Sequence, residues 1–212
     1  MNLDLVGRAL AGIDHARRGF PGLVCELGGG AVLGERYRHR RSLDIDFFLN
    51  NVQALPLLSP RLNGALSRGM TDYDEGSSAV EVRYAEGKVD FIVAPDLTRL
   101  PSEPMLLGDT TVQAQATAEI LAKKILYRAA DLPIRDVFDL AVVLAETPDV
   151  LTAVQPFAVL RCRELLGRLV ALEPRFEARS RLELLLEPGA DRFIPRAVVE
   201  VHAWVLGLRA DG

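Results

Sequence analysis

The chain has 212 residues, of which 49% are hydrophobic and 25% are charged, as in a globular protein with one medium domain or two small ones. Its formal net charge of -4 excludes a protein that holds nucleic acid mainly through a global basic excess. Cys25 and Cys162 are far apart and match no metal or redox spacing, and no apolar run approaches the roughly 18 residues that span a bilayer. We therefore expect a cytoplasmic protein with buried thiols and no membrane segment.

The first elements along the chain form a strand and helix unit. Apolar residues recur at three- and four-residue steps over 3–13, and Gly19 ends this pattern, which predicts an amphipathic helix. The apolar run at 22–27 suits a buried strand. The glycines at 28–30 then turn the chain, and 31–37 is typical of a helix that starts just after the turn.

The next strand is predicted at 42–49, where apolar and polar residues alternate. Period two places Asp44 and Asp46 on the same side of this strand. The opposite face then holds Leu43, Ile45 and Phe47. A hairpin is predicted at 78–93, and its second arm carries Asp90 inside an apolar run.

After about residue 110 the patterns favour helices, at 111–130, 134–146, 156–173 and 195–210. Two prolines and a glycine over 101–108 mark a junction between an α/β half and a helical half. The pattern of strands followed by helices indicates an α+β chain with one domain at 1–108 and a helical domain at 109–212.

Three strand carboxylates are the candidate reaction centre. Asp44, Asp46 and Asp90 supply the hard oxygen ligands that Mg²⁺ prefers, and two such metals would stabilise the attacking and leaving oxygens of an in-line transfer. The alternative is that Asp44 and Asp46 lie on a solvated strand face. Asp90 favours the metal site, because a carboxylate in an apolar strand is costly unless it is paired or bound to metal.

The glycines at 28–30 have two readings. Their N–H groups either approach a nucleotide triphosphate near a helix N-terminus, or they form an ordinary tight turn. The segment lacks both the P-loop and the dinucleotide-binding patterns. The run of basic residues that follows is equally open, since it suits either a nucleotide or RNA end or a solvated loop. Its members are Arg36, Arg38, His39, Arg40 and Arg41.

Together, a glycine pair, Asp-x-Asp on the next strand and a later third carboxylate resemble the nucleotidyltransferase superfamily. More specifically, "LGGGAV" and "HRRSLDIDFF" resemble the "GGTAL" and "HRxSxDxDFF" segments of the AbiEii-type nucleotidyltransferases, the toxins of abortive-infection toxin–antitoxin pairs. The residues in register are His39, Arg40, Ser42, Asp44, Asp46, Phe47 and Phe48. Gly30 stands where the family has threonine or serine, and the register favours an inward-pointing Arg40.

The helical half also carries a block, from 118 to 144, that resembles the family's "LAxKL...R...RDxxDL". It places Lys124, Arg135, Asp136 and Asp139 at family positions, and the resemblance implies that Lys124 and Asp139 join the active site. By pattern alone, the basic residues of this helix are more typical of a solvated stripe. Asp136 also suits a helix N-terminus, and Asp139 suits a partner for Lys124 or Arg135. Residues 150–212 carry no recognisable motif.

The resemblance implies a nucleotidyltransferase-type mixed β-sheet flanked by helices, followed by a helical C-terminal domain. It implies transfer of a nucleoside monophosphate from an NTP to an acceptor such as a tRNA 3′ end, with Mg²⁺ or Mn²⁺ on Asp44, Asp46 and Asp90. A cognate antitoxin and a role in phage defence are also implied. The expected nucleotide-binding residues are Gly28, Gly29, Gly30, Arg40, Ser42, Lys124, Arg135 and Asp136. The alternatives are transfer to a small molecule or protein hydroxyl, and a catalytically weak nucleotide- or protein-binding module.

Overall fold

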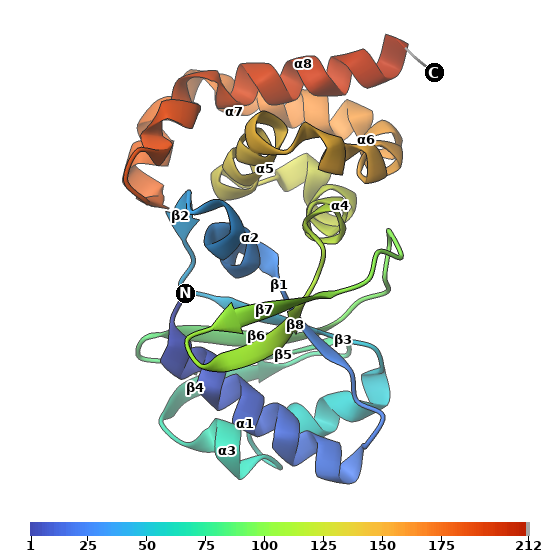
Figure 1. The fold of residues 1–212 in the computed structure, drawn as a ribbon, viewed down its shortest axis with the longest axis vertical. Helices are drawn as coiled ribbons and strands as arrows, with labels where there is room; N and C mark the ends of the chain where they lie inside the picture. Colours follow the sequence, from blue (N-terminus) through green and yellow to red (C-terminus); the bar gives the residue numbers. More distant parts are fainter. Residues whose placement is uncertain (211–212) are drawn as a thin grey trace. The chain divides into compact units, whose positions relative to one another are not determined.

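The computed structural model describes residues 1–210, and the chain divides into two compact units (Figure 1). The sheet unit contains residues 1–32, 42–95 and 101–115. The helical unit contains 33–41, 96–100 and the chain from Ala116 onward. The boundary expected between 108 and 109 falls in the turn between two paired strands of the sheet unit.

The sheet unit is built on a seven-stranded mixed sheet in the order β4-β5-β6-β3-β1-β8-β7. The β3–β6 and β1–β8 pairs are parallel and the other pairs are antiparallel. The strands are β1 Cys25–Gly28, β3 Ile45–Leu49, β4 Met70–Glu75, β5 Ala79–Tyr84, β6 Gly87–Val93, β7 Glu103–Leu107 and β8 Thr110–Ala114. The predicted mixed sheet and the hairpin of β5 and β6 are confirmed.

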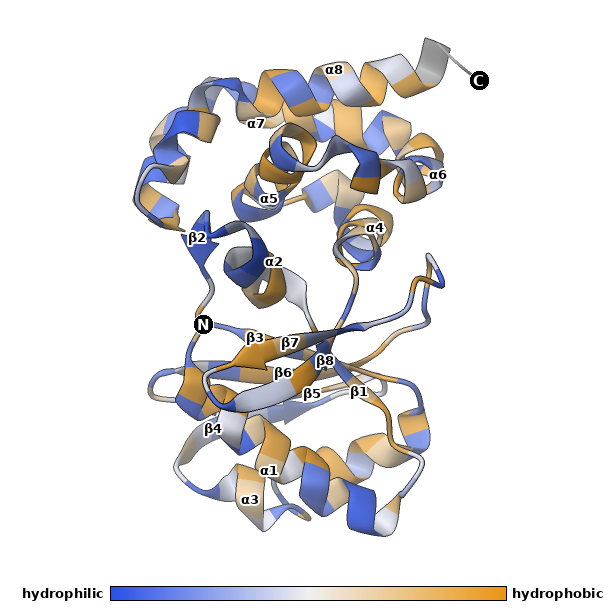
Figure 2. Cartoon of the chain, in the orientation of Figure 1, coloured by the Kyte–Doolittle hydropathy of each residue, from blue (hydrophilic) through white to orange (hydrophobic). Residues whose placement is uncertain are grey.

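The core of this unit lies on the sheet face that α1 covers. α1 (Leu3–Gly19) begins where the Asn2 side chain accepts hydrogen bonds from two backbone N–H groups, and its apolar stripe is buried. α3 (Gly64–Ser67) and the 3₁₀ helix Val52–Leu58 pack beside it (Figure 2). Alternate strand residues fill the interior, with the rings of Phe47 and Phe91 stacked 6.2 Å apart.

Two predictions near these strands are wrong. Leu43 precedes β3 and is 57% exposed, so it does not join the buried face. The helix predicted from 111 begins instead at Thr117, because residues 110–114 form β8 and pair with both β7 and β1. Pairing on both sides outweighs the helical spacing of this run, whose Thr110, Thr111 and Val112 are β-branched.

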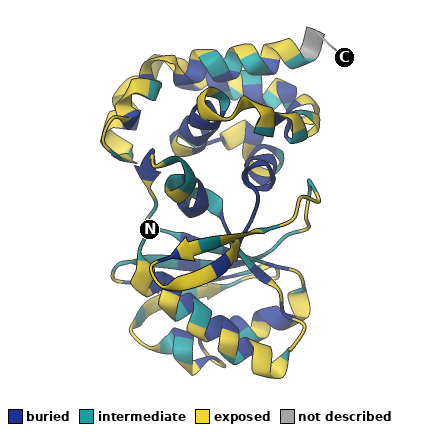
Figure 3. Ribbon diagram, viewed as in Figure 1, coloured by how far each residue is buried: buried dark blue, intermediate teal, exposed yellow. Residues whose placement is uncertain are grey.

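The helical unit carries the remaining helices. They are α4 Thr117–Arg128, α5 Ile134–Glu146, α6 Gln155–Leu160, α7 Cys162–Glu183 and α8 Ala197–Ala210, with 3₁₀ helices Ala129–Asp131, Pro148–Ala153 and Ala190–Arg196. α4 and α5 are buried along most of their length (Figure 3). The single helix predicted at 156–173 is two helices, which meet at Arg161. Within residues 1–210, no helix is both long enough and apolar enough to cross a membrane.

Candidate active site

The sheet brings two of the predicted carboxylates together. β3 and β6 are parallel neighbours whose register pairs Asp46 with Asp90. Paired residues on adjacent strands project from the same face of a sheet. Asp44 lies one residue before β3 and is half-buried. Asp46 and Asp90 therefore share one sheet face, and the same placement of Asp44 stays a prediction.

The first two glycines allow β3 to approach the start of α2 (Gly29–Tyr37) closely. Gly29 has φ +66°, in the left-handed region, and a Cβ there would clash with Oδ2 of Asp46. Gly28 lies opposite Asp46 in the register, and a Cβ on it would meet the ring of Phe48 and the amide of Gln115. β1 ends at Gly28 and α2 begins at Gly29, so the chain turns at the predicted glycines, and Gly30 lies in the first turn of the helix.

A row of carboxylates crosses four neighbouring strands. The register pairs Asp74 with Glu81, Glu81 with Asp90, and Asp90 with Asp46. We call these four residues the carboxylate row. Asp74 was not predicted because β4 was not, although acidic residues at every second position in "MTDYDE" are a period-two signal.

Two cations lie against this row. Lys88 Nζ is 2.5 Å from Glu81 Oε2 and 2.9 Å from Asp90 Oδ2. Arg83 bridges Glu81 and Asp72. Burial raises the pKa of Asp90, and the Asp46 carboxylate raises it further against the opposing pull of Lys88, to about 6. The hydrogen bond from Lys88, by contrast, lowers the pKa of Glu81.

The pair of Asp46 and Asp90 fits a magnesium ion that is completed by substrate. Within residues 1–210, no group of three or more histidine, cysteine, aspartate or glutamate side chains is arranged to hold a metal ion. Mg²⁺ usually takes one or two carboxylates together with substrate phosphates and water. Two paired aspartates on one face supply that donor set, and the backbone of Gly29 lies beside one of them.

A second group of charged residues lies inside the helical unit. Arg40 donates from Nε to Asp139 Oδ1 at 2.6 Å and from Nη2 to Asp139 Oδ2 at 2.8 Å. His39 Nε2 donates to Asp139 Oδ1 at 2.7 Å. All three side chains are buried, which confirms the inward-pointing Arg40. Burial alone would raise the pKa of Asp139, but Arg40 and Lys124 hold it well below its usual range.

Lys124 completes this group, which we call the buried ion-pair cluster: His39, Arg40, Lys124, Asp136 and Asp139. Lys124 Nζ pairs with Asp136 and lies 3.1 Å from Asp139 Oδ2, so the predicted partnership of Asp139 with Lys124 is confirmed. Asp136 lies in the first turn of α5, also as predicted. The solvated stripe is wrong for Lys123 and Lys124, which are 5% and 8% exposed.

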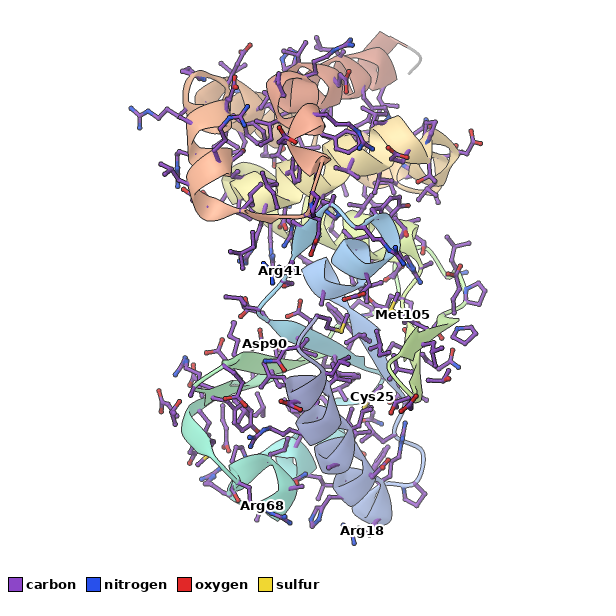
Figure 4. All side chains as sticks on the ribbon, turned by 60° about the vertical axis from the view of Figure 1, so that its left-hand side comes forward. Arg18, Cys25, Arg41, Arg68, Asp90 and Met105 are labelled. Carbon is purple, nitrogen blue, oxygen red and sulfur yellow. The ribbon has the colours of Figure 1, made fainter. Side chains whose placement is uncertain are left out.

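The C-terminal residues that carried no motif hold the basic segment in place. β2 (Arg40–Arg41) pairs antiparallel with β9 (Leu185–Leu186), which follows α7. The backbone N–H of Glu187 also donates to the carbonyl of His39. Figure 4 marks Arg41, which is exposed beside Glu187. Two-residue strands give no periodic signal, so the sequence offered no indication of this pairing.

The other predicted residues occupy separate positions. Ser42 Oγ donates to the backbone carbonyl of Asp44 at 3.2 Å. Arg135 is exposed on α5. Glu119 was not predicted, yet it is buried on α4 and accepts hydrogen bonds from the backbone N–H groups of Leu97 and Thr98. The sequence feature that could have indicated Glu119 is a carboxylate on the apolar side of a helix.

Comparison with known families decides the assignment. Residues 16–204 match the family model described as the nucleotidyl transferase AbiEii toxin of a type IV toxin–antitoxin system. The chain belongs to the AbiEii nucleotidyltransferase toxin family. It is therefore an enzyme, a nucleotidyltransferase, as the glycine and Asp-x-Asp segments predicted. A search of curated proteins found no match.

Solved structures show the same fold. MenT4, a nucleotidyltransferase toxin from Mycobacterium tuberculosis, is 18% identical with a TM-score of 0.55, over 98% of this chain and 86% of that chain. JHP933 from Helicobacter pylori is 17% identical with a TM-score of 0.54, over 99% and 92%. ANT(2″)-Ia in complex with adenylyl-2″-tobramycin is 16% identical with a TM-score of 0.52, over 73% and 95%. The predicted nucleotidyltransferase fold is confirmed.

Proposed function

We propose that this AbiEii-family enzyme transfers a nucleoside monophosphate from an NTP to an acceptor hydroxyl and releases pyrophosphate, with Mg²⁺ or Mn²⁺ as its cofactor. The observation that carries the proposal is the pairing of Asp46 with Asp90 on one sheet face, beside the backbone of Gly29. Nucleotidyl transfer needs hard oxygen ligands for a cation that also binds substrate phosphates.

Each group of the sheet unit has a role in this proposal. Asp46 and Asp90 would hold the metal, with Asp44 just before β3 as a further carboxylate, and the metal would stabilise charge on the reacting oxygens. Asp90 also accepts the proton of the acceptor hydroxyl, as a carboxylate next to the reacting oxygens can. The N–H groups at the start of α2, at Gly29 and Gly30, border the triphosphate, because a helix N-terminus favours anions. Gly28 permits the close approach.

The roles proposed for the remaining residues rest on the family motif. Lys124 would neutralise phosphate charge and Asp139 would support it, with Arg40, Ser42, Arg135 and Asp136 among the nucleotide-binding residues. The ion pairs of Arg40 with Asp139 and of Lys124 with Asp136 show a structural contribution as well.

A radiolabel experiment tests the reaction. Each NTP, labelled at the α-phosphate, is offered with tRNA, protein and hydroxylated small molecules. We expect label on the 3′ end of tRNA from the α-labelled but not the γ-labelled NTP, and no label with Asp46→Asn. Asp14→Asn, an exposed acid on α1, is the matched control and should transfer normally. Label only on protein or a small molecule would reject the tRNA acceptor, and no transfer from any NTP would reject the enzyme reaction.

We also propose that the transfer makes the protein a toxin of a phage-defence pair, that it acts in the cytoplasm, and that a cognate antitoxin opposes it. Expression should arrest growth, Asp46→Ala should abolish the arrest, and co-expression of a neighbouring antitoxin gene should relieve it. Growth arrest by the Asp44→Ala, Asp46→Ala double variant would contradict this mechanism.

A further inference from the structure

Lys88 stands out among the charged residues of the sheet unit. It lies two residues before Asp90 on β6, so both side chains project from the same sheet face. Its ammonium contacts two members of the carboxylate row at once, Glu81 at 2.5 Å and Asp90 at 2.9 Å. The reaction proposed above assigns no part to either Lys88 or Glu81.

The electrostatics of the row explain why a cation lies there. Asp46 and Asp90 are paired on neighbouring strands about 5 Å apart, and like charges directly opposite each other destabilise a sheet. Lys88 brings a positive charge to this pair through its contact with Asp90.

We propose that Lys88 is the built-in counter-ion of Asp90, and that a divalent cation displaces it onto Glu81. Lys88 neutralises Asp90 while no metal is bound. When the metal takes Asp90, Lys88 keeps its ion pair with Glu81 and no charge is left without a partner. Lys88 is thus a positioning residue, and Glu81 acts through it. This inference rests on the proposed metal role of Asp46 and Asp90.

The proposed displacement predicts that substitutions of Lys88 and Glu81 change the Mn²⁺ affinity in opposite directions. Lys88→Met removes the competing cation, so Mn²⁺ should bind about fivefold more tightly, which corresponds to the upper range of a partly exposed ion pair. Glu81→Gln leaves Lys88 with Asp90 as its carboxylate partner in the row, so Mn²⁺ should bind more weakly, by about two- to fivefold. Lys88→Arg should retain affinity close to that of the wild type.

Arg83→Met is the matched control. Arg83 lies on the same sheet face and contacts the same Glu81, but its other ion-pair partner is Asp72 rather than a proposed metal ligand. We expect its Mn²⁺ affinity to stay within about twofold of the wild type. A large change would show that any positive charge near the row has the same effect as Lys88.

The full chain is titrated with Mn²⁺ alone, and the electron paramagnetic resonance signal of free Mn²⁺ gives the affinity. Melting temperatures are also measured in EDTA and in Mn²⁺. In the Lys88→Met, Glu81→Gln double variant, affinity should equal that of Lys88→Met, because Glu81 acts only through Lys88. Lys88→Met should melt at a lower temperature than the wild type in EDTA. Its melting temperature should rise more on addition of Mn²⁺ than that of the wild type.

Three results would overturn the inference. They are Lys88→Met affinity equal to or weaker than that of the wild type, additive effects in the double variant, and no Mn²⁺ binding by Lys88→Met. Failure of the proposed function would give a different result. If the wild type binds Mn²⁺ and Asp46→Asn does not, but no label is transferred from any NTP, the proposed reaction is rejected. The assignment of Lys88 as counter-ion is then retained.

Discussion

The carboxylate row and the buried ion-pair cluster use the same charged groups in opposite ways. The row pairs acids with acids across strands, and burial and Asp46 raise the pKa of Asp90 to about 6. In the cluster, each acid has at least two cationic partners within 3.2 Å, and Arg40 and Lys124 overcome the effect of burial to lower the pKa of Asp139. Removal of one partner from the cluster leaves a buried charge uncompensated, whereas the facing acids of the row suit a cationic ligand.

The same contrast divides the segment "HRRSLDID". His39 and Arg40 belong to the helical unit and bind Asp139, whereas Asp44 and Asp46 belong to the sheet unit, where Asp46 is part of the carboxylate row. Neighbouring charges of opposite sign in the sequence therefore have separate partners. The basic half contributes to structure and the acidic half supplies the proposed metal ligands.

The largest predicted effect lies in the cluster. Asp139→Asn should lower the free energy of unfolding by about 3–5 kcal/mol, because it leaves the Arg40 guanidinium buried without its carboxylate. Urea denaturation followed by circular dichroism measures this loss. Glu183→Gln is the control, since its pair with Arg179 is exposed on α7 and should change stability by less than about 0.5 kcal/mol. Equal effects of the two variants would contradict the comparison.

The next effect tests how closely Gly29 approaches Asp46. Gly29→Ala should lower stability by about 1–3 kcal/mol, because φ +66° strains an alanine and its Cβ clashes with the Asp46 carboxylate. It should also abolish nucleotide transfer. Gly7→Ala is the control: no atom lies within 4 Å of the added Cβ, and alanine in α1 should stabilise by about 0.5–1 kcal/mol. Full activity of Gly29→Ala would show that Gly29 is not part of the active site.

Lowering the pH should change the stability contributed by the carboxylate row and by the buried ion-pair cluster in opposite directions. The folded pKa of Asp90 lies above its unfolded value, so its contribution is fully present below about pH 4 and is lost as pH rises through about 6. Metal-free wild type should therefore lose about 1–2 kcal/mol relative to Asp90→Asn between pH 4 and 7, after allowance for solvent screening. The depressed pKa of Asp139 makes the cluster lose stability only as pH falls below about 4. Melting temperatures across pH for wild type, Asp90→Asn and Asp139→Asn measure both slopes, and parallel slopes would contradict the account.

The smallest effect on stability is expected in the row. Asp46→Asn removes one of two like charges, so the metal-free protein should be unchanged or more stable by up to about 1 kcal/mol, although nucleotide transfer is lost. The measurement is urea denaturation in EDTA beside the radiolabel assay. A loss of stability as large as that of Asp139→Asn would show that Asp46 is a structural residue.

Regular patterns carried most of what could be predicted. Period two placed Asp44 and Asp46 on one face, and the hairpin placed Asp90 on a strand, but no local pattern says that β3 and β6 are neighbours in register. The residues of β8 also have helical spacing, its hairpin partner β7 was not predicted, and its other partner, β1, is far away in the sequence. The family motif selected Lys124 and Asp139, whereas Lys88 and Glu81 became visible only when the strands were paired.

Diffraction from crystals grown with Mn²⁺ and a slowly hydrolysed NTP analogue tests the central claim directly. We expect an anomalous-scattering peak about 2.0–2.6 Å from carboxylate oxygens of Asp46 and Asp90, with Asp44 on the same side and Lys88 withdrawn to Glu81. A metal that binds the nucleotide without touching Asp46 or Asp90, or one held by other residues, would contradict it.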